Sequence, residues 1–300
     1  PKNAWSDRVP ARGDAFTGIR LSRRRDIPFL RRIYRKSFGD GQKSEDLLFG
    51  ELYGEDNCYV LTRFGFPAAM AFVLPVSVRG EGKEWHGCYL YAVATHPGQR
   101  GKGFGSRLIS RIHADAEARG LDFALLVPAT PELFGFYARL GYESAGRICR
   151  YEYVSFAPLT DRPEVIHISG DWYGMARERM LRGQIHLVWQ EQLLMYQSKM
   201  LSLFGGGFCL LRENGADIGC AAISRAGGAL DVQEILVPPG RLSASLAALA
   251  AHYGAGRVNV RLEAARGEGM GIQAQKLAAV CAPPAARAAL QELYVALVMD

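Results

Sequence analysis

The stretch HPGQRGKGFG, residues 96–105, constrains the fold more than any other segment of the chain, because it holds four glycines and two cations in ten residues. A near-continuous apolar run, residues 87–97, leads into it. The segment that follows, residues 106–120, places Leu108, Ile109, Ile112 and Ala116 on one helical face. The sequence therefore predicts a buried strand, a glycine loop and an amphipathic helix in direct succession.

A glycine loop at the start of a helix is suited to holding an anion. The first N–H groups of a helix lack intrahelical partners, and the helix dipole favours negative charge there. Glycines at 101, 103 and 105 permit positive φ and close approach to the backbone, while Arg100 and Lys102 supply charge. A merely flexible turn is the alternative, but the strand before the loop and the helix after it favour a pyrophosphate cradle.

Two well-known phosphate motifs do not fit this loop. A Walker A loop counted from Gly98 would need Lys and Ser or Thr where Phe104 and Gly105 stand. The dinucleotide pattern G-x-G-x-x-G fails because Ser106 occupies the third glycine position. What remains is Arg100-x-x-Gly103-x-Gly105.

The rest of the first half predicts a mixed α/β unit. Asp26 is the expected N-cap of its first helix. The expected elements are a strand at 18–22, helices at 26–38 and 44–54, strands at 57–65, 67–78 and 87–97, a helix at 106–120, a strand at 121–127, a helix at 131–142 and a strand at 147–156.

The second half repeats this order weakly, which a tandem duplication explains; chance similarity of apolar patterns is the alternative. Gly215 follows Gly65 by 150 positions, and Pro239 follows Pro97 by 142. The segment LYVALVM, residues 293–299, is expected to be the last strand. The length of 300 residues and this repeat predict a polar lead-in at 1–17, a catalytic domain at 18–157 and a degenerate domain at 158–300.

Charge and cysteine content narrow the expected cellular location and binding partners of the protein. Residues 1–155 hold 23 Lys and Arg against 17 Asp and Glu, and residues 156–300 hold 13 of each, so the net charge of +6 lies in the first half. The basic run at 20–36 could contact nucleic acid, but the solvated face of a helix is favoured because no aromatic stacking motif accompanies it. No CxxC spacing and no apolar run near ~18 residues occur. We therefore expect a cytoplasmic protein with buried thiols, no metal and no membrane partner.

The motifs together resemble the GNAT acetyltransferase superfamily. Residues 92–109, AVATHPGQRGKGFGSRLI, match its Arg/Gln-x-x-Gly-x-Gly/Ala signature, and FYARLGY, residues 136–142, matches its Phe-Tyr-x-x-x-Gly-aromatic segment. The two-unit arrangement is similar to that of mycothiol synthase and of the enhanced-intracellular-survival type acetyltransferases. The resemblance implies that acetyl-CoA binds along the strand end and the loop, at Val93, Ala94, Thr95, Arg100, Gly101, Lys102, Gly103, Phe104, Gly105 and Ser106.

The resemblance also assigns a general acid but leaves the base open. Tyr137 matches the usual proton donor to the leaving thiolate; a packing tyrosine is the alternative. Many relatives carry a glutamate on the strand before the glycine loop, whereas this strand has no carboxylate. Glu84, His86, His96, an ordered water chain and a carboxylate from elsewhere in the chain are weighed as substitutes. Glu234, on the corresponding strand of the second half, is interpreted as a solvated or salt-bridged residue.

The sequence thus predicts a tandem GNAT protein that transfers an acetyl group from acetyl-CoA to a primary amine by direct attack, with only the first unit active. The acceptor is a small-molecule or peptide amine, and a homo-oligomer is left open. The alternative hypothesis is a non-catalytic acyl-CoA-binding sensor or interaction protein, which the missing carboxylate favours and Tyr137 disfavours.

Overall fold

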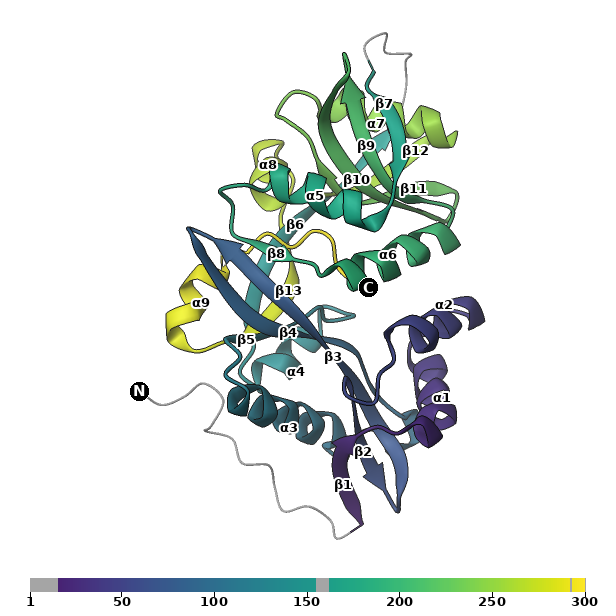
Figure 1. Ribbon diagram of the computed structural model, residues 1–300, viewed down its shortest axis with the longest axis vertical. Coiled ribbons are helices and arrows are strands. Elements are labelled where there is room, and N and C mark those ends of the chain that lie inside the picture. The colour runs from purple at the N-terminus through teal and green to yellow at the C-terminus, as the bar shows by residue number, and fades with distance from the viewer. Residues whose placement is uncertain (1–15, 155–161, 292, 300) are drawn as a thin grey trace. The chain divides into compact units, whose positions relative to one another are not determined.

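The computed structural model describes residues 16–154, 162–291 and 293–299 and consists of two compact units (Figure 1). The described residues of 1–145 and 278–293 form the first unit, and those of 146–277 and 294–299 form the second. Each unit contains a mixed β-sheet flanked by helices, which confirms the predicted fold class. Of the lead-in predicted at 1–17, residues 1–15 lie outside the described residues, and Thr17 already belongs to the first strand of the sheet.

The sheet of the first unit has the strand order β1-β2-β3-β4-β5-β13. Neighbouring strands are antiparallel except for the parallel pair β4 and β5. The strands are β1 (Thr17–Leu21), β2 (Cys58–Arg63), β3 (Phe66–Gly80), β4 (Lys83–Thr95), β5 (Phe123–Leu126) and β13 (Gln275–Cys281).

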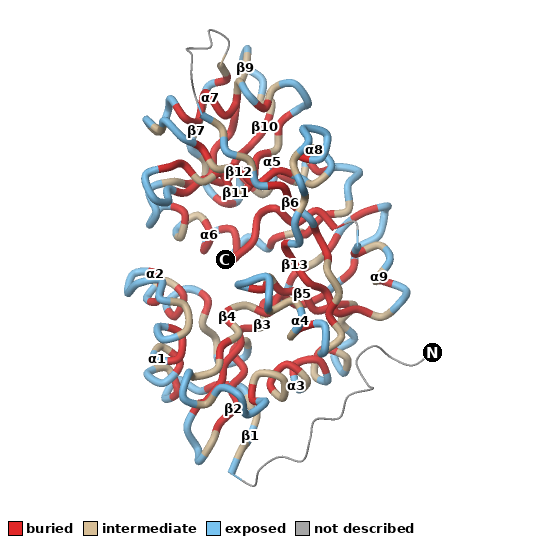
Figure 2. Tube along the Cα trace, turned by 180° about the vertical axis from the view of Figure 1, so that it is seen from behind, coloured by how far each residue is buried: buried red, intermediate tan, exposed pale blue. Residues whose placement is uncertain are grey.

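Helix α3 (Phe104–Ala118) covers one face of this sheet. Its apolar side chains and alternate residues of β2 to β5 form one core, which also includes Tyr137 of α4 (Leu133–Ala138). The core appears in Figure 2 as buried (red) segments. Helix α1 (Ile27–Ser37) packs on β3 and β4, and α2 (Gln42–Leu47) continues into a π-helical turn at Leu48–Leu52. Helix α9 (Pro284–Gln291) completes the unit.

The predicted N-cap of α1 is in place but is used differently. Asp26 precedes the helix without a side-chain cap. Its carboxylate instead accepts hydrogen bonds from the Arg23 amide at 2.9 Å and from Arg20 at 2.6 Å. The residue therefore ties the start of α1 to β1 rather than capping the helix.

The sheet of the second unit has the order β6-β12-β11-β10-β9-β7, again with one internal parallel pair, β11 with β12. Its strands are β6 (Glu143–Val154), β7 (Glu164–Ile168), β9 (Gly207–Glu213), β10 (Ala216–Ala226), β11 (Ala229–Leu236) and β12 (Arg257–Glu263). The short strand β8 (His186–Val188) bridges to Tyr294 through His186. The helices are α5 (Gly170–Met180), α6 (Glu191–Leu203), α7 (Leu242–Tyr253) and α8 (Ala264–Gly269).

The two units exchange strands relative to the chain order, so the compact units differ from the ranges 18–157 and 158–300. Strand β6, next after α4, pairs with β12 in the second unit. Strand β13, from the C-terminal part of the chain, pairs with β5 in the first. The prediction of a strand at 293–299 is wrong: residues 294–299 are buried in the second unit without forming one, and their apolar composition reflects burial.

Two expectations about composition can be compared with the structure. All six cysteines are free and buried, as expected from their apolar surroundings. Within the described ranges, we find no helix with the length and apolar character needed to cross a bilayer.

Candidate active site in the first unit

A gap opens between the two parallel strands at the centre of the first sheet. Strands β4 and β5 pair only from Gly87 to Tyr89, opposite Phe123 to Leu125. Beyond that point β4 continues to Thr95 and stays bonded to β3, with Ala94 opposite Met70. One edge of residues 93–95 is therefore bonded to β3, while the edge toward β5 has no strand partner in the described chain. Backbone groups on such an edge need another hydrogen-bond partner.

A β-bulge lies where the strands part. Tyr91 pairs with Phe72 and Ala94 pairs with Met70, so Ala92 and Val93 together oppose a single residue of β3. Ala92 has a φ of 49°, which is rare for a residue with a side chain. The bulge redirects β4 at the start of the gap. Nothing in the sequence signalled it, because alanine is not a typical residue for a positive φ.

The glycine loop follows β4 and has the predicted conformation. Gly101 and Gly103 have φ of 78° and 71°, and a Cβ at either position would meet nothing within 4 Å. Helix α3 starts at Phe104, and its first internal bond runs from the Arg107 amide to the Gly103 carbonyl at 3.0 Å. The amides of residues 104–106 therefore have no carbonyl partner within the helix. They form a row of donors at its positive end.

The side chains of the loop leave this row accessible. Arg100 and Lys102 are exposed; Arg100 Nε donates to the Thr95 carbonyl at 3.3 Å and Lys102 Nζ to Gln99 Oε1 at 2.9 Å. The Phe104 ring is buried in the core below α3, so this residue has only backbone to offer a ligand.

Gly105 brings the loop, the strand end and helix α4 together. A Cβ on Gly105 would lie 3.5 Å from Thr95 Oγ1 and 3.8 Å from Cζ of Phe136. Gly105, unlike Gly101 and Gly103, does not have a positive φ. Glycine is therefore needed at 105 for the space that it leaves between these two side chains.

Tyr137 lies beside this junction in an apolar setting. It is 7% exposed, and its ring makes edge contacts with Phe136 and Tyr142, with centroids 5.1 and 5.6 Å apart. Burial raises the pKa of its phenol to about 12. The hydroxyl is therefore protonated at neutral pH and can donate a proton. The same core includes Cys281 of β13, a contribution of the exchanged strand that the sequence did not indicate.

Of the candidate bases named from the sequence, Glu84 and His86 lie far from the gap along β4, whereas His96 directly follows the strand. Glu84 pairs with Arg79, and His86 Nδ1 contacts Ser77 Oγ at 3.0 Å. At roughly 3.3 Å of rise per residue, His86 lies about 20 Å before the bulge along β4. His96 Nδ1 accepts a hydrogen bond from the Gly98 amide at 3.2 Å, so the lone pair that could accept a proton is already used. Burial and the nearby cations, first Lys36 and then Arg32 and Arg100, lower the pKa of His96.

The second unit has a related strand with different chemistry. Glu234 on β11 is fully buried and accepts hydrogen bonds from Arg177 Nε at 2.8 Å, Tyr173 Oη at 2.5 Å and the Leu297 amide at 3.3 Å. The interpretation of Glu234 as a salt-bridged residue agrees with this network. No acidic group free to act on a substrate remains at this position.

The described residues contain no cluster of three or more His, Cys, Asp or Glu side chains placed to hold a metal ion. The donors gathered at the gap are instead backbone amides and cations, which suit an anionic ligand with amide groups.

Comparison with known proteins places this site in a family. Residues 18–145 match the model of the acetyltransferase (GNAT) domain. No curated protein matches the sequence. Among solved structures, a GCN5-related N-acetyltransferase from Anabaena variabilis has a TM-score of 0.70 at 16% identity, over 88% of this chain and 72% of that one.

Two further structures cover more of this chain. Eis1 from Mycobacterium abscessus aligns with a TM-score of 0.65 and 12% identity, over 91% of this chain and 75% of its own. A putative acetyltransferase from Pyrococcus horikoshii aligns over 97% and 99%, with a TM-score of 0.61 and 13% identity. At these identities the structures show a shared fold that extends through both units.

The segment 18–145 therefore matches a GNAT acetyltransferase domain, and this match supports acetyl transfer in general for the first unit. This confirms the resemblance drawn from the motifs at 92–109 and 136–142.

Proposed function

We propose that the first unit is an acetyl-CoA-dependent N-acetyltransferase that acetylates a primary amine by direct attack. The observation that supports this most is the continuous path from the open edge of β4 to the start of α3. The edge at residues 93–95 offers backbone groups for an amide-bearing arm, and the loop beyond it offers donors for a pyrophosphate.

Two parts of acetyl-CoA then have proposed partners. The pantetheine arm pairs with the backbone of Val93, Ala94 and Thr95 in the gap. The pyrophosphate lies on the amides of the loop and the first turn of α3, with the charges of Arg100 and Lys102 beside it. The residues proposed for the pyrophosphate are Arg100, Gly101, Lys102, Gly103, Phe104, Gly105 and Ser106.

The proposed chemistry needs a proton donor for the departing sulfur. The neutral amine forms a bond to the thioester carbonyl carbon, and the C–S bond breaks as the intermediate collapses. Tyr137 donates its phenolic proton to the thiolate as that charge develops. Its raised pKa makes it a weak acid, so the transfer must be concerted with cleavage of the C–S bond rather than precede it.

The proton released by the amine has no carboxylate to receive it on the part of β4 beside the gap. Residues 88–95 contain no acidic side chain, and the Nδ1 atom of His96 is engaged. We therefore infer that solvent accepts this proton, as in the water-mediated alternative considered from the sequence.

The alternative function is an acyl-CoA-binding sensor, favoured by this missing carboxylate. Steady-state thiol release from acetyl-CoA, measured with the full chain across a panel of amines and peptides, separates the two. Amine-dependent release supports the transferase. Calorimetric binding of acetyl-CoA without release by any amine would favour the sensor, and no binding would refute the proposed site.

A further inference from the structure

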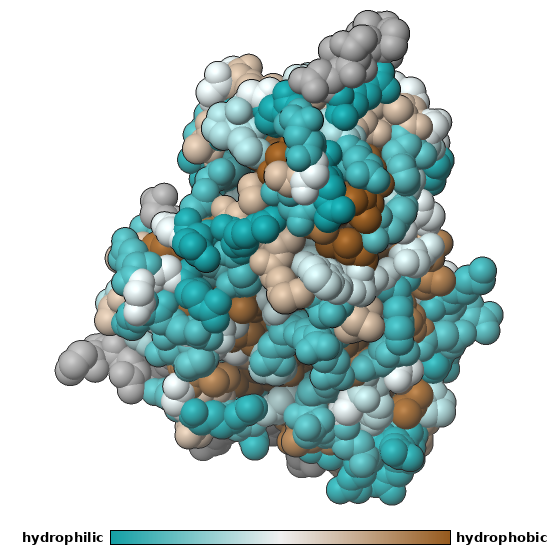
Figure 3. Space-filling view, turned by 45° about the horizontal axis from the view of Figure 1, so that its top comes forward, coloured by the Kyte–Doolittle hydropathy of each residue, from teal (hydrophilic) through white to brown (hydrophobic). Residues whose placement is uncertain are grey.

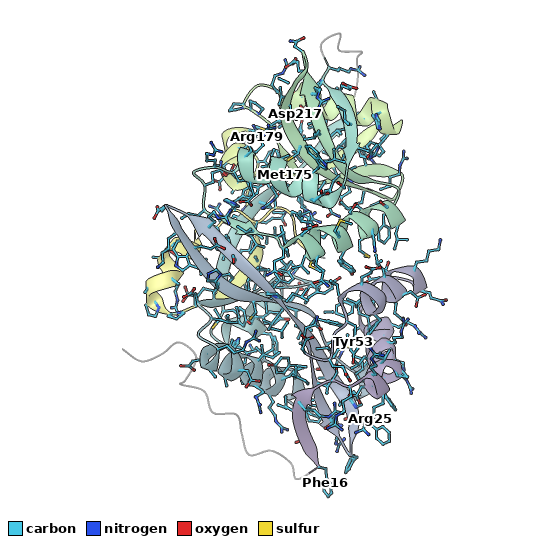
Figure 4. All side chains as sticks on the ribbon, in the orientation of Figure 1. Phe16, Arg25, Tyr53, Met175, Arg179 and Asp217 are labelled. Carbon is cyan, nitrogen blue, oxygen red and sulfur yellow. The ribbon has the colours of Figure 1, made fainter. Side chains whose placement is uncertain are left out.

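Four of the five large hydrophobic side chains that are exposed in the described part of the first unit gather at one end of its sheet. Every large hydrophobic residue that is exposed in the described part of this unit lies in or beside β1, α1 or the β2–β3 turn. Rings from separate segments pair there: Phe16 with Phe64 at 5.1 Å and Phe29 with Phe66 at 5.3 Å between centroids. Figure 4 shows Phe16 projecting beyond the end of β1, with Arg25 near the start of α1. We call Phe16, Phe29, Phe64 and Phe66, with Arg32 and Arg63, the aromatic–basic patch.

The β2–β3 turn carries a phenylalanine where the backbone disfavours one. Phe64 and Gly65 have φ of 49° and 83°, and the corresponding turn of the second unit, Asn214 and Gly215, has 49° and 79°. Asn-Gly is the usual choice for such a turn, and a bulky residue at positive φ is an outlier. Phe64 is 58% exposed, so burial in the core does not offset this cost. The turn reads Arg-Phe-Gly-Phe in the first unit and Glu-Asn-Gly-Ala in the second.

The same end of the unit is positively charged. A hollow of about 290 Å³ lies among the phenylalanines, and its lining contains two arginines and no carboxylate. The Arg63 guanidinium lies 5.0 Å from the centre of the Phe64 ring and donates to Gln99 Oε1 at 3.1 Å. Arg31 and Arg35 of α1 pair with Glu45, whereas no ion pair of Arg32 is found within the described ranges. The lining residues are Phe29, Arg32, Ile33, Arg63, Phe64, Phe66, Pro67, Ala68, His96 and Gln99.

We propose that the aromatic–basic patch docks the protein onto an anionic phospholipid surface. The phenylalanine rings enter the interfacial region, Arg32 and Arg63 contact headgroup phosphates, and the hollow receives one headgroup. Aromatic side chains flanked by cations are the combination that binds peripheral proteins to such surfaces. The prediction of no membrane partner rested on the lack of a spanning segment, and this patch is a surface feature that needs none.

Nucleic acid is the other polyanion that could meet this charge, but the geometry disfavours it. Stacking of a base requires an open aromatic face. The Phe64 ring has the Arg63 guanidinium over it and Phe16 beside it at an interplanar angle of 37°. Phe66 is similarly tilted against Phe29 at 53°. Rings tilted against each other suit insertion into an apolar layer, where no stacking partner is needed.

The test is sedimentation of the full chain with vesicles of phosphatidylcholine, with and without phosphatidylserine. We expect binding to the anionic vesicles that weakens as salt is raised. The double variant Phe64→Asn, Phe66→Ala copies the turn of the second unit and should lower the partition coefficient about tenfold or more. It should unfold at the same temperature as the parent or higher, because asparagine tolerates the positive φ.

The matched control is Trp172→Ala. Trp172 is 58% exposed on α5 of the second unit. Figure 4 shows Met175 and Arg179 of the same helix and Asp217 of β10, which pairs with Arg179. Figure 3 shows hydrophobic and hydrophilic side chains side by side on the face that it presents. This variant should leave vesicle binding unchanged. Arg32→Glu provides a second variant outside the turn and should abolish the preference for anionic vesicles.

Equal binding to neutral and anionic vesicles, or equal loss in the Trp172 variant, would overturn the proposal. So would retention on single-stranded DNA that the turn variant abolishes, in the absence of vesicle binding. Free inorganic phosphate should not release the protein from vesicles except through ionic strength, and release at matched ionic strength would indicate a small-anion site instead.

Discussion

The loops that precede α3 and α7 occupy the same place in two related units and differ in what they can bind. Gly103 precedes α3 with a φ of 71°, whereas Arg241 precedes α7 with a φ of −98° and is paired with Glu213. The loop before α7 begins with Pro238 and Pro239, which have no N–H to donate. The amides of residues 242–244 at the start of α7 also lack an intrahelical partner, but the loop before them has two prolines and an ion-paired arginine where the first unit has glycines and exposed cations.

The strands that lead into these loops also share a feature and use it differently. Both β4 and β11 bulge after their parallel pairing ends, with the extra residue before Ala94 in one and at Gln233 in the other. Two positions before the end of each strand, β4 has half-buried Val93 and β11 has Glu234, which is fully buried. The carboxylate sought in the first unit is present in the second, where Arg177 neutralises it and it holds residue 297 in place. The same backbone therefore serves an open site in one unit and packing in the other.

The largest expected effect comes from placing a negative charge in the open loop. Gly103→Asp should abolish acetyl-CoA binding measured by calorimetry, because an anion would stand beside the proposed pyrophosphate. The fold should persist with a modest loss of stability, since a Cβ there meets nothing within 4 Å but the φ of 71° is unfavourable for a side chain. Gly240→Asp is the matched control, with a φ of 86° and equally open space in the second unit. Loss of acetyl-CoA binding in both variants, or in neither, would contradict the proposed difference between the two loops.

Next in size is the removal of the proposed proton donor. Tyr137→Phe should lower turnover by roughly 10²–10⁴-fold while acetyl-CoA affinity changes little, because the ring and its packing are kept. Tyr142→Phe is the control: its hydroxyl contacts His113 at 3.0 Å in the same core, and turnover should be close to that of the parent. If the Tyr137 variant turned over as fast as the parent, Tyr137 would be a packing residue only.

Helices α3 and α7 should also differ in how acid affects their stability. The buried residues of α7 include no titratable group, whereas α3 buries His113, and burial lowers its pKa to about 4. Above pH 6.5 this histidine is neutral in both states and its contribution is complete. As the pH falls toward 4, the unfolded chain takes up the proton and the folded chain does not, so stability is lost.

Over that interval the loss from His113 should approach about 3 kcal/mol. The measurement is the free energy of unfolding in urea at pH 7 and at pH 4.5. His113→Gln keeps a hydrogen-bonding side chain next to Tyr142 but does not titrate, so its loss between the two values should be smaller. Parallel curves for parent and variant would contradict the assignment.

The parts of the molecule that the sequence predicted were those fixed by local pattern. The glycine loop, the helix after it and the β2–β3 and β9–β10 hairpins each carry their signal within about ten residues. The positions of Tyr137 and of Gly101 and Gly103 followed from the same short motifs. For these elements, local propensity and the final structure agree.

What the sequence did not predict depends on contacts between distant segments. Nothing local indicates that residues 148–154 pair with 257–263, or that 279–281 pair with 124–126. The segment at 293–299 is apolar enough for a strand, but it is buried without joining a sheet. The bulge at Ala92 likewise arises from the register of β3 and β4 and not from a turn-forming residue.

The smallest expected effect concerns the second unit, which should bind no acetyl-CoA. A hollow of about 450 Å³ does lie at the end of β11, lined by Ile235–Pro239 and by Leu262 and Glu263 of β12. Its size would admit a pantetheine arm, but the loop beside it lacks the three glycines and the exposed cations of the first unit. Arg266 donates to the Val237 carbonyl at 2.7 Å, and the prolines of the loop offer no amide. Native mass spectrometry of the full chain with acetyl-CoA should therefore count one ligand. Gly103→Asp should reduce this number to zero, and Gly240→Asp should leave it at one. Two ligands on the parent chain would show that the hollow alone is enough and that the loops do not decide binding.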